Sequence, residues 1–172
     1  MSTLRVDNLN ARTGTSISVP TGTRMYLPGH IVQLQSYDLT TYTTTTSTSF
    51  VDTGLTVTIS PTSASSKIYI IVSLGTSSQA SNGTVLFNLI RNSTTIAQPS
   101  SGSQASSINM FPGSTSGSWG VFRTFVDSPA TTLATTYKVQ WKVDGGTGYL
   151  NRHQASTEYN TYSEIVVMEI AQ

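Results

Sequence analysis

The chain alternates apolar and polar residues over short runs, and this period of two constrains its fold more than any other feature. From 137 to 143, Tyr, Val, Trp and Val occupy every second position, with Lys, Gln and Lys between them. Successive side chains of a strand point to opposite faces of a sheet, so the pattern predicts a strand with one buried face. The segment 50–59 alternates in the same way, with Leu55, Val57 and Ile59 on one face. These runs predict strands rather than helices.

Similar runs recur along the chain, separated by segments rich in Gly, Pro, Ser and Asn. Short strands at regular spacing are typical of β-sandwiches and related folds. The sequence therefore predicts an all-β protein, a jelly-roll-like β-sandwich of about eight antiparallel strands over residues 31–172. DGGTG (144–148) is predicted to be a tight hairpin turn. The predicted strands are 31–35, 50–59, 67–74, 84–92, 119–127, 137–144 and 162–171, with a Thr-rich connection or edge strand at 36–49.

The composition favours an ordered protein with an uncharged surface. Only 10% of the residues are charged and the net charge is +1, whereas disordered chains combine high net charge with few β-branched residues. The nine basic residues are scattered, which argues against a nucleic-acid partner because phosphate binding needs several converging Lys and Arg side chains. No segment approaches the ~20 apolar residues of a membrane span, so we expect no membrane partner.

Two of the predicted strands carry apolar residues on both of their faces. The runs Ile68–Val72 and Ile165–Met168 lack the alternation of a strand that faces water on one side. We expect both to lie in one sheet whose outer face is also covered, either by sister subunits of a homo-oligomer or by a thicker monomer core. The residues assigned to this subunit interface are Ile68, Ile70, Val72, Ile165 and Val167.

Residues 1–30 differ from the rest and predict an extended N-terminal arm. Closely spaced turn residues such as Pro20, Gly22, Pro28 and Gly29 exclude a long helix. The arm combines arginines with short apolar residues, and extended segments can add to an exposed sheet edge. It is predicted either to bind a partner or only to knit the oligomer together. Its candidate partner-binding residues are Leu4, Arg5, Val6, Leu9, Arg12, Ile17, Val19 and Arg24.

The chain offers little for catalysis or metal binding. It has no cysteine, and its two histidines, His30 and His153, lack a second histidine at metal-ligand spacing. No GxSxG nucleophile motif is present. We therefore expect neither an enzyme nor a cofactor nor a metal site.

One group of residues has the chemistry of a sugar site, because aromatic rings cover the apolar face of a sugar while polar groups bind its hydroxyls. The candidate glycan-binding residues are Tyr149, Asn151, Arg152 and His153. Trp141 and Tyr159 lie near them in the sequence, although the alternation around Trp141 favours a place in the core.

The order of these segments resembles that of a family of tailed-bacteriophage virion structural proteins, of the marine and cyanobacterial phage type. The resemblance covers most of the chain. The matching blocks are TSFVDTGLTVTISPTSASSKIYIIVSL (48–74), LFNLIRNSTTI (86–96), DSPATTLATTYKVQWKVDGGTGYLN (127–151) and EIVVMEI (164–170).

This resemblance implies a homotrimer with a jelly-roll head domain, similar to the trimeric domains of the tumour-necrosis-factor and complement type. It leaves two places in the virion open. A capsid decoration (cement) protein would sit on the capsid exterior and bind the major capsid protein through its arm. A tail-fibre or receptor-binding tip would bind tail proteins and a host-surface glycan. The small size and the lack of a repetitive shaft favour the decoration protein, and a free lectin is a third alternative.

Overall fold

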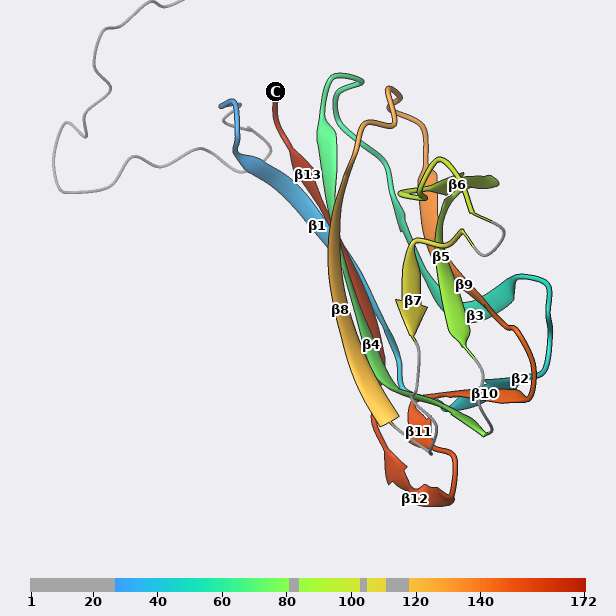
Figure 1. The fold of residues 1–172 in the computed structure, drawn as a ribbon. Helices are drawn as coiled ribbons and strands as arrows, with labels where there is room; N and C mark the ends of the chain where they lie inside the picture. The colour runs from blue at the N-terminus through green and yellow to red at the C-terminus, as the bar shows by residue number, and fades with distance from the viewer. Residues whose placement is uncertain (1–26, 81–83, 103–104, 111–117) are drawn as a thin grey trace, which may run out of the picture.

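The computed structural model describes residues 27–80, 84–102, 105–110 and 118–172. This part of the chain contains thirteen strands and no helix. The strands form two antiparallel sheets that pack against each other, with a small hairpin at one end (Figure 1). The predicted all-β sandwich is confirmed. All eight candidate binding residues of the arm lie outside the described residues.

The first sheet, which we call the β4 sheet, has the long strand β4 at its centre. One edge of β4 pairs with β8, and the other pairs first with β13 and then with β10. β1 pairs with β13 and β2 pairs with β10. The bounds are β1 Ile31–Leu39, β2 Thr43–Thr45, β4 Lys67–Ala80, β8 Ser118–Asp127, β10 Thr147–Leu150 and β13 Ser163–Ile170.

The second sheet, the β9 sheet, follows the order β3-β9-β5-β6, and β7 pairs with the other half of the β5 edge. The chain passes repeatedly from one sheet to the other, so most neighbouring strands of a sheet are distant in sequence, with the β5–β6 hairpin as an exception. The bounds are β3 Val51–Ile59, β5 Val85–Arg91, β6 Thr94–Ile96, β7 Ile108–Met110 and β9 Thr135–Val143. A separate hairpin consists of β11 Arg152–His153 and β12 Ser156–Asn160.

The core lies between the two sheets and is built from every second residue of their strands. In β9 the buried positions alternate strictly with half-buried ones. Trp141 is 1% exposed, and its ring stacks on Phe87 with the ring centroids 6.2 Å apart. The interpretation of Trp141 as a core residue is therefore confirmed.

The two sheets are also joined by a polar cluster at one edge of the core. Nη1 of Arg91 lies 2.8 Å from Oδ1 of Asp127, and the hydroxyl of Tyr137 donates a hydrogen bond of 2.7 Å to Oδ2 of the same carboxylate. Asp127 ends β8 in the β4 sheet, whereas Arg91 and Tyr137 belong to the β9 sheet. The cluster therefore ties one sheet to the other.

The structure corrects two details of the predicted strand map. Thirteen strands occur in the described residues instead of about eight, because short strands such as β7 and β12 lie where no strand was predicted. β2 lies within 36–49, the stretch predicted as a Thr-rich connection or edge strand. The turn at 144–148 does not close a hairpin, since β9 and β10 belong to different sheets. Asp144 binds the backbone of Thr84 through its own N–H and side chain, and the chain then crosses to the β4 sheet.

The five residues assigned to a subunit interface are core residues, so that assignment is wrong. Ile68, Ile70, Val72, Ile165 and Val167 are each 0% exposed and pack between the sheets. The sequence predicted correctly that the two strands share a sheet, since β13 pairs with β4. When odd-numbered and even-numbered residues of a strand are both apolar, the sequence does not reveal which of the two sets faces the other sheet. The outer face carries the alternate residues.

Candidate functional site

β2, β10 and the β11–β12 hairpin lie at one end of the sandwich (Figure 1), and there an arginine contacts two tyrosine rings. The guanidinium carbon of Arg152 lies 5.0 Å from the ring centroid of Tyr42 and 5.0 Å from that of Tyr149. Its Nε donates to the carbonyl of His153 at 3.1 Å. The contact joins predicted site residues Tyr149 and Arg152 to Tyr42, which sequence reasoning missed.

His153, the next residue, contacts a different ring. Its imidazole meets Tyr159 edge to face, with centroids 6.5 Å apart and planes at 85°. Nδ1 of His153 accepts a hydrogen bond of 3.1 Å from the backbone N–H of Ala155. The ring of Tyr159 remains 71% exposed. Arg152 and His153 therefore bring three tyrosines to this end of the molecule, and we call Tyr42, Tyr149, Arg152, His153 and Tyr159 the tyrosine cluster.

Asn151 does not belong to this surface, which corrects its assignment as a glycan-binding residue. It is 0% exposed and its φ is +65°, a left-handed conformation that Asn tolerates better than most residues. Its amide donates to the carbonyls of Leu39 at 2.7 Å and Thr41 at 3.0 Å. Its Oδ1 accepts a hydrogen bond of 2.6 Å from the hydroxyl of Ser163. The side chain is fully engaged within the protein.

The outer face of the β4 sheet is a second candidate, because apolar side chains form rows across its strands. The register aligns Leu34, Met168, Tyr69 and Val126 in one row. Leu34 is 50% exposed and Val126 is 64% exposed. The next row contains Val166 and Ile71. We call this surface the outer patch; its members are Leu34, Tyr69, Ile71, Val126, Val166 and Met168.

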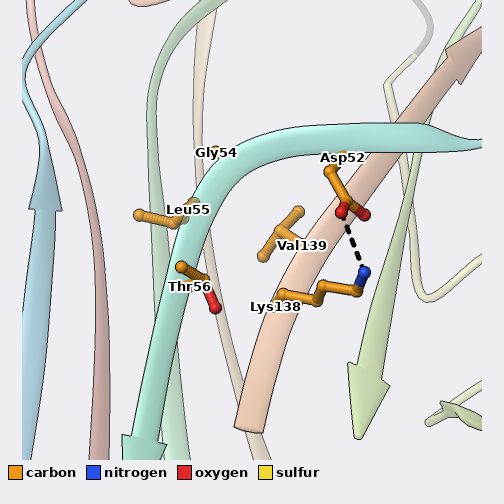
Figure 2. Close-up of a pocket in the computed structure, with 6 residues that line it drawn as sticks. All are labelled: Asp52, Gly54, Leu55, Thr56, Lys138 and Val139. Atoms are coloured by element: carbon orange, nitrogen blue, oxygen red, sulfur yellow. Dashed lines mark hydrogen bonds and ion pairs between the residues drawn. The ribbon is translucent and has the colours of Figure 1, made fainter. Parts of the chain in front are cut away.

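A small hollow lies beside β3, where the pairing with β9 slips between Asp52 and Thr56. Gly54, with φ +91°, lies within the slip, and the cavity beside it measures about 110 Å³. Figure 2 shows Asp52 and Lys138 pointing toward each other at its rim, with Lys138 Nζ 2.8 Å from Asp52 Oδ2. Hydrogen bonds from Lys138 and Gln140 lower the pKa of Asp52. Because Asp52 and Lys138 pair with each other at the rim, the hollow is a structural feature of the irregular pairing between β3 and β9.

Two further ionisable groups have shifted pKa values, and both have structural roles. Burial and the hydrogen bond to Asp127 raise the pKa of Tyr137, which lies in the polar cluster that joins the two sheets. Glu169 is 0% exposed, and its carboxylate accepts hydrogen bonds from the Thr62 backbone and hydroxyl, both at 2.8 Å, and from Gln33 at 2.7 Å. These bonds fix the turn after β3 to β13.

The described residues contain no group of three His, Asp or Glu side chains placed to hold a metal ion. None of the same residues forms a helix that could cross a membrane. Comparison of the chain with protein-family models found no match, and comparison with curated proteins also found none.

Proposed function

We propose that the chain is a virion structural protein, a homotrimeric capsid decoration protein that binds the outside of the head shell through its N-terminal arm. The observation that carries this proposal is the outer patch, an apolar sheet face with side chains as exposed as Val126 at 64%. Apolar patches that remain contiguous on a folded domain mark surfaces that meet other proteins. The resemblance to phage virion proteins suggests that the assembly in which this surface is buried is a virion.

The strand order supports the jelly-roll assignment within this proposal. Strands β3, β5 and β9 lie in one sheet, while the intervening strands β4 and β8 lie in the other. A jelly roll alternates between its two sheets in this way. The β4 sheet would then face the three-fold axis, with the outer patch of each subunit covered by its neighbours.

Quantitative measurement of the copy number per virion tests the proposal. A decoration protein is expected in hundreds of copies at three-fold positions of the shell, whereas a fibre tip is expected in few copies on the tail. Deleting residues 1–25 should leave a folded oligomer that no longer binds capsids. Full capsid occupancy by the truncated protein would contradict the role of the arm.

The tyrosine cluster favours a second candidate function, the tip of a tail fibre that reads a glycan on the host surface. The strands β10 and β12, which carry Tyr149 and Tyr159, lie at one end of the sandwich (Figure 1), where a distal tip would meet a cell. A low copy number together with antibodies that block adsorption would favour this alternative.

A further inference from the structure

The tyrosine cluster combines exposed rings with neighbours that hold them in place. Tyr159 is 71% exposed and Tyr42 is 49% exposed, and Tyr149 is half-buried. We propose that this cluster is a carbohydrate-binding site that takes a hexose unit of a surface polysaccharide. The proposal goes beyond the decoration function and does not depend on it, since either place in the virion can carry such a site.

The site is preorganised, because its central side chains are fixed by their own chain. The Arg152 guanidinium donates from Nε to the carbonyl of His153 and from Nη2 to that of Gln154, at 3.1 and 3.4 Å. It is therefore held while it stacks on Tyr42 and Tyr149. Rings that are fixed before binding lose little conformational entropy when a ligand arrives.

The strand behind the cluster is anchored as well. The three side-chain hydrogen bonds of Asn151 tie the start of the hairpin to the segment after β1 and to β13. The backbone N–H of Thr161 donates to the carbonyl of Asn151 at 3.0 Å, which closes the base of the hairpin where both strands leave the sandwich. The position of the cluster relative to the sandwich is thereby set by buried contacts.

The chemistry around the rings fits a sugar better than a protein or a nucleic acid. Residues 151–160 contain no Leu, Ile, Val, Met or Phe, whereas the centre of a protein interface is apolar and excludes water. Such an apolar surface lies elsewhere, on the outer patch. Arg152 and His153 are the only basic residues of the segment, too few for a phosphate backbone.

A hexose offers the complementary surface. One face of the sugar ring presents C–H groups that pack on an aromatic ring, and its edge presents hydroxyls that bind polar side chains. At this end of the molecule the exposed ring of Tyr159 lies on β12. Thr157, two residues away on the same face of the strand, is also exposed, and the imidazole of His153 contacts the ring. Ring and polar groups are thus adjacent, as a glycan requires.

The test uses the full-length protein and three probes: linear trisaccharides of glucose, of galactose and of N-acetylglucosamine. Binding is followed by saturation-transfer NMR and by titration. We expect at least one probe to bind with a Kd of about 1 mM or tighter. Tyr159→Ala and Arg152→Lys, which removes the planar stacking group but keeps the charge, should each weaken binding at least about tenfold. Tyr159→Phe, which keeps the ring, should bind within about threefold of the wild type.

Tyr37→Ala is the matched control, because Tyr37 is 43% exposed on β1 and lies outside the cluster. It should bind like the wild type, and circular dichroism should show all variants folded. The proposal is overturned if no trisaccharide binds with a Kd of about 1 mM or tighter, or if Tyr159→Ala and Arg152→Lys bind as well as the wild type. Neither result bears on capsid occupancy, so the decoration function is judged separately.

Discussion

Glu169 is a buried carboxylate that forms no ion pair with any residue the structure describes, and it should make stability depend on pH. Burial by itself would raise its pKa, but hydrogen bonds from Gln33, Ser66 and Thr62 outweigh burial and lower it. The folded pKa therefore lies below the unfolded value of about 4.3. The resulting stabilisation is complete above that unfolded value and is lost as the pH falls toward the folded pKa.

Glu169→Gln should remove this dependence. Glutamine keeps the size but replaces one acceptor by a donor, which then faces the donors of Gln33 or Thr62. We expect the free energy of unfolding at neutral pH to fall by about 2 kcal/mol, the scale of hydrogen bonds to a charged group. Urea unfolding at about pH 7 and at about pH 3 measures the free energy of unfolding and its pH dependence. Glu164→Gln, on the opposite face of the same strand, is the control, and equal pH dependence in both variants would refute the role of Glu169.

Asn151 shows what sequence reasoning at a single residue could not reach. Its amide side chain and its position in the sequence beside Tyr149 and Arg152 are typical of a sugar site. In the structure, however, the amide donates hydrogen bonds to the backbone carbonyls of Leu39 and Thr41. Those partners are more than a hundred residues away in the sequence, so no local pattern signals them. Tyr42 was missed for the same reason, because its contact with Arg152 joins distant segments.

Asn151→Asp tests this structural role. The carboxylate would place oxygen opposite two backbone carbonyl oxygens in a fully buried position. We expect the free energy of unfolding to fall by about 3 kcal/mol or more, measured by urea unfolding. Asn160→Asp on β12, where the exposed side chain donates one hydrogen bond to the carbonyl of Thr157, should change it by about 1 kcal/mol or less. Equal stability of the two variants would contradict the role assigned to Asn151.

At the scale of elements, the long strands were predictable from the sequence, but the points where a strand changes its pairing partner were not. The predicted strand at 50–59 differs from β3 by one residue, because strict alternation locates a half-buried strand. The strand predicted at 67–74 continues to Ala80 as β4. Its partner changes from β13 to β10 along that length. The glycine at that point does not by itself reveal which strand is the new partner.

Gly75 lies where β4 changes partner, and the site has no room for a side chain. A Cβ there would lie 2.5 Å from the carbonyl oxygen of Tyr162 and 2.7 Å from Oδ1 of Asn151. Gly75→Ala should therefore lower the free energy of unfolding by about 2 kcal/mol and the Tm by roughly 4–8 °C. Scanning calorimetry measures the change. Gly145→Ala, where a Cβ meets nothing within 4 Å, should leave the Tm nearly unchanged or raise it slightly, because alanine lowers the entropy of the unfolded chain. A similar drop in Tm there would show that the loss at Gly75 does not come from crowding.

At the scale of the whole molecule, the sequence predicted that one sheet would be apolar on both faces, and the structure shows which residues lie on the outside. The outer patch crosses all of β1, β13, β4 and β8, so any partner that covered it would have to span the width of the sheet. A single side chain or a short loop is too small for that. A second copy of the chain offers a surface of matching width and chemistry.

Val126→Asp tests this packing. Val126 is 64% exposed, so the substitution should cost the isolated subunit less than about 1 kcal/mol. In an assembled trimer it would bury an unpaired charge among Tyr69 and its neighbours, which costs several times more. Size-exclusion chromatography with light scattering should show the wild type at three times the subunit mass of 18.4 kDa and the variant as a folded monomer. Leu133→Asp, 75% exposed and outside the patch, should remain trimeric. A trimeric Val126→Asp protein would mean that the subunits meet through another face, and a monomeric wild type would remove the trimer from the proposed function.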